Sequence, residues 1–214
     1  MVEPTEGAGS ITGAVLLMAA VGLLAPAELE AQARIGSGEG FTGATYVSAG
    51  YVVNAPNQRL GFSLMTVGSS WGGWGLYVDA KKTTGSPKGE ATFDPTRTAT
   101  DVAANTPQDQ LFVEESAWRS LNGAIVRALG SEFAVYAGGG VTEETAYDEY
   151  RDWDQRTTAD AFYWVEDEVS GGTEANVLGG VFFRATRNLI FQAGAEANPP
   201  GFTVGVAVGL PVDG

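Results

Sequence analysis

Residues 202–210 read Phe-Thr-Val-Gly-Val-Ala-Val-Gly-Leu, and this stretch decides the fold. Its even-numbered positions are all large and apolar, whereas its odd-numbered positions hold only threonine, glycine and alanine. Successive side chains of a β-strand point to opposite faces of the sheet, so this alternation predicts a strand. One face of that strand is bulky and apolar, and the other face is uniformly small.

The same period of two residues recurs in the chain before this stretch. Leu189 and Phe191 share a face that excludes Gln192 and Glu196. Residues 115–128 keep a helix as an alternative, because their two arginines fall on the same predicted face as apolar residues. We expect eight strands, at about residues 41–53, 60–67, 73–81, 115–128, 132–147, 173–186, 188–197 and 202–210.

Short and long connections alternate between these strands. Short ones fall at about 68–71, 129–131 and 186–187, while 82–112 and 148–172 are long. In an antiparallel meander every second connection lies at the same end, so the two long loops share one end. Eight strands can close on themselves, which removes the exposed edges of the sheet. The sequence therefore predicts an all-β fold: a closed antiparallel up-and-down barrel of about eight strands, with two long loops at one end.

The N-terminal segment differs from the rest in composition. Residues 11–25 are an uncharged run, ITGAVLLMAAVGLLA, and Ala31-Gln32-Ala33 matches the small-x-small pattern of a cleavage site. The run suits the core of a signal peptide and is shorter than the roughly 20 residues of a membrane-spanning helix. We predict a signal peptide over residues 1–33, cleaved after Ala33, and a single barrel domain over 34–214. An uncleaved helical anchor is the alternative, since no Lys or Arg precedes the run.

Composition excludes several kinds of chemistry. The chain has 214 residues, no His, no Cys and a formal net charge of −14. It therefore has no Ser-His-Asp triad, no thiolate nucleophile, no disulfide and no zinc–thiolate site, and it lacks the basic surface that nucleic acid requires. The acidic pairs Glu114-Glu115 and Glu143-Glu144 point to opposite faces of their strands, unlike a catalytic dyad. We expect no enzyme activity, no cofactor and no metal.

Two classes of barrel satisfy the strand pattern. A secreted, lipocalin-like carrier turns its apolar face inward around a ligand, whereas an outer-membrane barrel turns that face toward lipid. Water-facing surfaces carry roughly 25–35% charged residues, but the face opposite the apolar rows is mostly glycine, alanine, serine and threonine. That face suits the crowded interior of a narrow barrel. The pattern favours an outer-membrane barrel, with a periplasmic or secreted carrier as the alternative.

Across about residues 40–210 the chain resembles small eight-stranded outer-membrane β-barrels of the OmpA-like type. Four segments and the alternation of turns and loops carry the resemblance: GGWGLYVDAK (72–81), ANVLGGVFFRA (175–185), NLIFQAGAEA (188–197) and FTVGVAVGL (202–210). The resemblance implies a signal peptide, an outer-membrane location and periplasmic chain ends. We expect a protein in contact with membrane lipid, with a structural or surface-interaction role and at most a narrow pore. The sequence departs from the family at its last residues, LPVDG, where such barrels usually end in an aromatic residue.

Polar side chains occur at a few inward-facing positions of the predicted barrel, in pairs along three strands. Their charges are of both signs, so they can form a salt-bridge network that fills the interior and fixes the register of the strands. A narrow ion path lined by the same side chains is the alternative. The predicted network consists of Asp79, Lys81, Glu174, Arg184, Gln192 and Glu196, two from each of three strands.

The predicted loop 148–172 is acidic, with eight Asp or Glu residues against Arg151 and Arg156. A solvated surface loop accounts for this composition. A surface partner or a divalent cation bound at the loop is the alternative, because hard cations take oxygen ligands. Asp152-Trp153-Asp154 has the spacing of a calcium loop, but the third acid, the glycine and the distal Glu of such a loop are missing.

Overall fold

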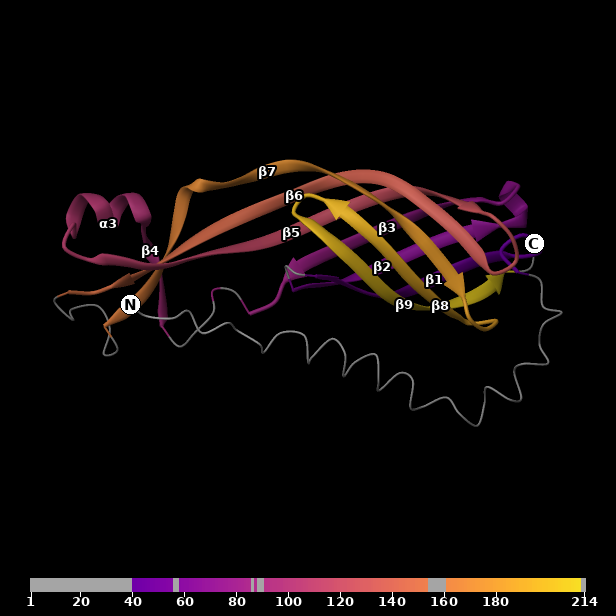
Figure 1. Ribbon diagram of the computed structural model, residues 1–214, viewed down its shortest axis with the longest axis horizontal. Coiled ribbons are helices and arrows are strands. Elements are labelled where there is room, and N and C mark those ends of the chain that lie inside the picture. Colours follow the sequence, from indigo (N-terminus) through magenta and orange to yellow (C-terminus); the bar gives the residue numbers. More distant parts are fainter. Residues whose placement is uncertain (1–39, 56–57, 86, 88–90, 154–160, 213–214) are drawn as a thin grey trace, which may run out of the picture. The chain divides into compact units, whose positions relative to one another are not determined.

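The computed structural model describes residues 40–55, 58–85, 87, 91–153 and 161–212 of the chain (Figure 1). The signal peptide predicted over residues 1–33 lies outside these residues, so the segment and its cleavage after Ala33 remain predictions. In the part of the chain that the structure describes, no helix is long and apolar enough to span a membrane.

Eight strands close into an antiparallel barrel, which confirms the predicted fold class. Neighbouring strands follow chain order, and β1 pairs with β9 to complete the cylinder, from Thr45 opposite Val212 to Ala55 opposite Phe202. One further strand, β4, lies outside the barrel beside β7. The barrel strands are β1 (Thr45–Ala55), β2 (Arg59–Gly68), β3 (Trp74–Thr83), β5 (Gln110–Ala128), β6 (Phe133–Arg151), β7 (Phe162–Arg184), β8 (Leu189–Ala197) and β9 (Pro200–Val212).

The two ends of the barrel differ in their connections. Residues 69–73, 129–132 and 185–188 connect strands at one end, where β1 also begins and β9 finishes. We call this the turn end. The opposite end, which we call the loop end, carries the connections that follow β1, β3, β6 and β8.

The side chains of β9 identify the two faces of the wall. Val208 is 61% exposed and points outward, whereas Thr203 on the other face is 2% exposed. Val206 lies on the outward face, directly opposite Tyr51 of β1 and Phe191 of β8. A carrier requires these aliphatic rows to line the interior, and they do not. The observed orientation therefore contradicts the alternative that the protein is a carrier with an apolar interior.

The helix alternative for residues 115–128 is wrong, because β5 passes through them as a strand that is paired on both sides. Its outward face carries Leu121 and Ile125 together with two arginines. The mixed pattern has a physical cause. Arg119 and Arg127 lie at the two borders of the apolar outer surface, so they share a face with the residues between them without interrupting it.

Three strands continue past the loop end of the barrel (Figure 1). β3 pairs with β5 only as far as Arg119, and β8 pairs with β7 only from Leu178 onward, while β5, β6 and β7 stay paired with one another beyond these points. β4 (Thr92–Thr98) runs parallel to the start of β7, and α3 (Ala99–Asn105) follows β4. We define the head as β4, α3 and residues 110–118, 143–151 and 162–173.

The head occupies most of the two long connections predicted at 82–112 and 148–172. These connections do lie at one end, but they contain regular structure that the sequence analysis does not predict. β6 extends to Arg151, and β7 begins at Phe162. Charged residues occupy both faces of these strand segments, so the alternation of apolar and polar residues that reveals the barrel strands is absent there.

The interior of the barrel divides into two layers. Toward the turn end it is apolar and aromatic, and Tyr77, Tyr136 and Phe182 pack with ring centroids 4.9 to 5.5 Å apart. Phe41, which we expected within the first strand, precedes β1 instead; it is fully buried and stands edge-on against Tyr46. Toward the loop end the interior is polar.

Candidate functional site

The polar layer of the interior is built around the carboxylate of Glu196. Arg59 Nη2 lies 2.9 Å from Glu196 Oε2, and Lys81 Nζ lies 2.5 Å from Glu196 Oε1. Lys81 Nζ also donates to Asp79 Oδ1 at 2.6 Å. All four side chains are at most 1% exposed. Two cations therefore meet two carboxylates, and the group carries no net charge, which burial of ions requires.

Neutral side chains complete this network. Asn122 Nδ2 donates to Asp79 Oδ1 at 2.9 Å, and Asn176 Nδ2 donates to Asn122 Oδ1 at 2.9 Å and to Glu196 Oε2 at 3.2 Å. The Thr203 hydroxyl donates to Glu196 Oε1 at 2.7 Å. Together with the ion pairs, these bonds join β2, β3, β5, β7, β8 and β9 across the interior. The arrangement can hold the register of the strands and occupies the space through which an ion would pass.

A further polar contact lies one layer closer to the turn end. Gln192 Nε2 donates to the Tyr77 hydroxyl at 2.7 Å and to the Tyr136 hydroxyl at 2.9 Å. The two tyrosine rings and Phe182 pack together beneath this amide. An eight-stranded barrel has an interior that side chains can fill, and large rings fill it here.

The structure buries four of the six predicted interior residues inside the barrel: Asp79, Lys81 and Glu196 meet in the network, and Gln192 lies in the next layer. Glu174 and Arg184 lie elsewhere and do not join the network. Glu174 is exposed at the loop end, where Asn198 Nδ2 donates to its carboxylate. Arg184 lies at the turn end and donates to the Ser131 carbonyl and the Tyr46 hydroxyl. Ten residues of β7 separate Glu174 from Arg184, which places them about 33 Å apart along the strand.

The sequence analysis does not identify Arg59, the second cation of the network. The predicted second strand begins at residue 60, whereas β2 begins at Arg59 itself. Arg59 shares the inward face with Ser63 and Met65, so extending the period of two residues by one position would have predicted an inward-facing Arg59. The sequence analysis does not identify Asn122 and Asn176 either, for a different reason. An uncharged amide at an inward position resembles the small polar residues that occupy neighbouring inward positions.

The head has a small core of its own. Thr98 caps the first turn of α3 in a reciprocal capping box, and Val102 of that helix packs against Tyr163 and Val165 of β7. The Tyr163 hydroxyl donates to Asp109 Oδ2 at 2.7 Å. Burial, followed by this bond to a carboxylate, raises the pKa of Tyr163 to about 12. The head is therefore a packed structure that presents defined surfaces.

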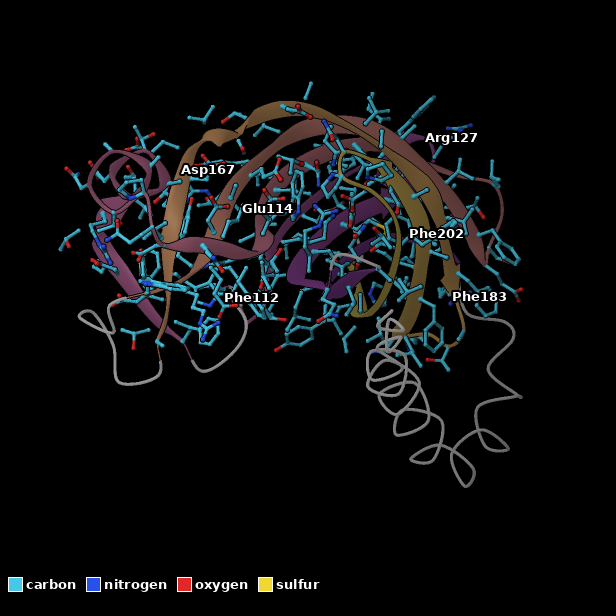
Figure 2. The ribbon with its side chains drawn as sticks, turned by 60° about the vertical axis from the view of Figure 1, so that its left-hand side comes forward. Phe112, Glu114, Arg127, Asp167, Phe183 and Phe202 are labelled. Carbon is cyan, nitrogen blue, oxygen red and sulfur yellow. The ribbon has the colours of Figure 1, made fainter. Side chains whose placement is uncertain are left out.

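Carboxylates gather on one face of the head. Glu114 of β5 lies directly opposite Asp148 of β6, and Asp167 of β7 lies in the next row toward the barrel (Figure 2). Burial, followed by the charges of Asp167 and Glu114, raises the pKa of Asp148. Asp154, part of the calcium-like spacing, lies outside the described residues. Within those residues no three acidic side chains are placed to hold a metal ion.

The outer surface of the barrel carries an apolar band with a basic residue at each border. On β5 the band extends from Arg119 to Arg127 through Leu121 and Ile125. The Arg127 guanidinium lies 4.7 Å from the centre of the Trp74 ring near the turn end, and tryptophan and arginine are typical of a membrane–water interface. The eight-residue interval spans about 26 Å along the strand, which a tilt of roughly 35–45° shortens to about 20 Å along the barrel axis, somewhat less than the roughly 25 Å apolar belt of transmembrane barrels.

A closed eight-stranded antiparallel barrel with an apolar outer band and a charge-paired interior is the architecture of small outer-membrane β-barrels. The chain has this architecture, and three of its strands extend to form the head. No protein-family model matches the chain. No curated protein matches its sequence.

Several solved structures are similar to this chain. Ail, the attachment invasion locus protein of Yersinia pestis, aligns with a TM-score of 0.46 and 13% identity, over 79% of this chain and 99% of Ail. The N-terminal β-barrel domain of Pseudomonas aeruginosa OprF aligns with a TM-score of 0.36 and 11% identity, over 78% and 96%. Neisserial surface protein A gives a TM-score of 0.31 and 12% identity, over 77% and 94%. These likenesses concern the arrangement of strands and say nothing of a ligand or partner.

Proposed function

We propose that this protein is a non-enzymatic outer-membrane β-barrel that holds an acidic head at the cell surface and conducts no solute through its interior. The observation that carries the proposal is the orientation of the wall. Bulky aliphatic and aromatic side chains face outward, while Arg59, Lys81, Asp79 and Glu196 pair inside. A protein in water would bury the first set and expose the second.

The outer membrane suits this wall for two reasons. Lipid offers no hydrogen bonds, so a spanning sheet must close, and the pairing of β1 with β9 closes this one. The outward rows then contact hydrocarbon, which is the favourable environment for them. With eight strands both chain ends of the barrel fall at the turn end, so periplasmic chain ends place the head outside the cell.

Three features support a closed interior. The network around Glu196 fills the polar layer, and the Gln192 amide with its two tyrosines fills the next layer. Phe41 closes the turn end, because its backbone N–H donates to the Ser131 carbonyl at 3.0 Å and its ring is fully buried. A narrow ion path is the second candidate, since the same charged residues would line it.

The head supports a role in surface contact. It carries eleven Asp or Glu residues against Arg97 and Arg151, so its field favours a positively charged partner. Glu114 and Glu115 are consecutive in β5 and point to opposite faces, which does not form an acid–base pair. With neither His nor Cys in the chain, binding rather than catalysis is the activity that these side chains support.

Cell fractionation tests the location. We expect the full chain in outer membranes, extractable by detergent, with a heat-dependent shift in gel mobility that marks a folded barrel. Protease added to intact cells should cut the head and leave a protected barrel fragment. Recovery of the protein as a soluble monomer from the periplasm or medium would contradict the proposal.

Conductance in planar bilayers tests the closed interior. We expect the purified full chain to insert and to give no steady conductance above the bare membrane, because side chains fill both the polar and the aromatic layer of the interior. Regular current steps from the folded, heat-modifiable form would contradict a closed interior and support the ion path.

A further inference from the structure

Two basic residues lie side by side on the outside of the barrel. Lys82, near the end of β3, is directly opposite Arg119 of β5 in the register of the two strands. Both belong to the outward-facing set: Lys82 is exposed, and the Arg119 side chain is 66% exposed. Directly opposite side chains have Cβ atoms about 4.5–5.5 Å apart, and like charges at this spacing destabilise a sheet. An anion that bridges the two would remove this cost.

The neighbouring charges leave one of these cations without a counterion. Glu143 of β6 is directly opposite Arg119 and accepts two hydrogen bonds from its guanidinium. Lys82 has no such neighbour, because the residue opposite it on β2 is Leu60. Within the described residues Lys82 takes part in no ion pair. The pair therefore keeps a net positive charge beside Glu143.

The position of the pair points to a lipid headgroup. Leu60 beside Lys82 is 45% exposed, and Leu121, two residues from Arg119 toward the turn end, is 56% exposed on the same face. The two cations thus mark the loop-side border of the apolar band. At that depth a bilayer presents its phosphate groups, and basic side chains at the border gain about 1 kcal/mol each from anionic lipid. The acidic head beyond the border repels free anions but not a lipid that arrives within the membrane.

We infer that Lys82 and Arg119 form a binding site for the phosphate group of an anionic lipid in the outer leaflet. The inference rests on the proposed membrane location. Lys82 supplies the uncompensated charge, and Arg119 supplies guanidinium N–H donors. Glu143 competes with the phosphate for the same donors, so its removal should strengthen the site.

The test compares lipids retained by the full chain in nanodiscs that contain phosphatidylcholine and phosphatidylglycerol. We expect the wild-type protein to retain phosphatidylglycerol in excess of its share when the discs are opened in a mass spectrometer. Lys82→Gln should lower that enrichment about fivefold, the factor that corresponds to about 1 kcal/mol for one basic residue. Glu143→Gln should raise it. Arg151→Gln removes an equal charge from the head, about 26 Å further along β6, and should leave it unchanged.

Each outcome has a distinct meaning. Equal enrichment in Lys82→Gln and wild type, or an equal loss in Arg151→Gln, would overturn the site while the barrel remains inserted. A second experiment measures how well inorganic phosphate and phosphatidylglycerol each protect Lys82 from acylation in detergent. If the two protect it equally, the site binds anions generally and the lipid assignment is wrong. A chain that fails to insert, shown by loss of the heat-dependent gel shift in the wild type, would instead overturn the proposed function.

Discussion

The barrel interior and the head both contain carboxylates, but the surroundings of these carboxylates differ between the two regions. Inside the barrel Asp79 and Glu196 share two cations and several amide and hydroxyl donors, all within hydrogen-bonding distance. On the head Glu114, Asp148 and Asp167 lie close to one another. Water reaches Glu114 and part of Asp167, although Asp148 between them is buried, whereas the low-dielectric interior of the barrel makes an unpaired charge very costly. Charge in the barrel is therefore structural, and charge on the head is available to a partner.

The largest effect should come from breaking the interior network at Lys81. Lys81→Met keeps the side-chain volume but leaves Asp79 without a cation and Glu196 with Arg59 as its only cation, which should cost about 3–5 kcal/mol of unfolding free energy. Urea unfolding in lipid vesicles measures it. The next residue offers a matched control, because Lys82 points outward, and Lys82→Met should change stability by no more than about 0.5 kcal/mol.

The same pair of variants can also contradict the structural role. If Lys81→Met unfolds at the wild-type urea concentration and raises conductance in planar bilayers, the network lines an ion path and does not stabilise the barrel.

An intermediate and local effect should follow from a change in the core of the head. Tyr163→Phe removes the hydroxyl that donates to Asp109 and keeps the buried ring. The expected cost is about 1 kcal/mol, the usual net contribution of one hydrogen bond. Hydrogen exchange should become faster in β4, α3 and the start of β7 only. Faster exchange throughout the barrel would show that head and barrel unfold as one unit, which would weaken the distinction drawn between them.

The smallest effect should come from pH acting on the head. Burial and two neighbouring carboxylates raise the pKa of Asp148, so the folded head binds a proton more tightly than the unfolded chain does. Stability from this group is fully present below the ordinary pKa of an aspartate, about 3.9, and is lost as pH rises through the raised folded value. Asp167 acts in the opposite direction, because the Ser170 hydroxyl bonded to it lowers its pKa.

Exchange rates in the head between pH 7 and pH 4 measure this balance. We expect protection of residues 143–151 to increase on acidification in the wild type and to change less in Asp148→Asn, with the barrel strands as an internal reference. An unchanged pH dependence in Asp148→Asn would assign the effect to another carboxylate.

Part of the candidate site could be predicted from sequence, and the limits have physical causes. Asp79, Lys81, Gln192 and Glu196 were identifiable because each is a large polar side chain at an inward position of a strongly alternating strand. Glu174 and Arg184 do not join that group, because alternation gives the face of a side chain but not its height along the axis. Arg59 was missed because the start of a strand is the least certain part of a strand prediction.

The head illustrates a different limit. Its strand segments combine consecutive buried residues, such as Tyr163, Trp164 and Val165, with charged residues on both faces, so apolar residues do not recur at every second position and composition alone indicates a loop. What makes them strands is continuation of the pairing between β5, β6 and β7 beyond the barrel, together with the packing of α3 on β7. Both are tertiary features that no local stretch encodes.

Local alternation in the sequence was enough to predict the strands and to separate an aliphatic face from a face of small residues, because the period of two residues is a property of each strand alone. The tertiary structure decided which polar side chains meet, since the contact between Arg59 and Glu196 joins residues 137 positions apart. The stagger of the closed sheet sets that contact. A chain reveals which of its side chains must avoid lipid, but only closure of the cylinder determines their partners.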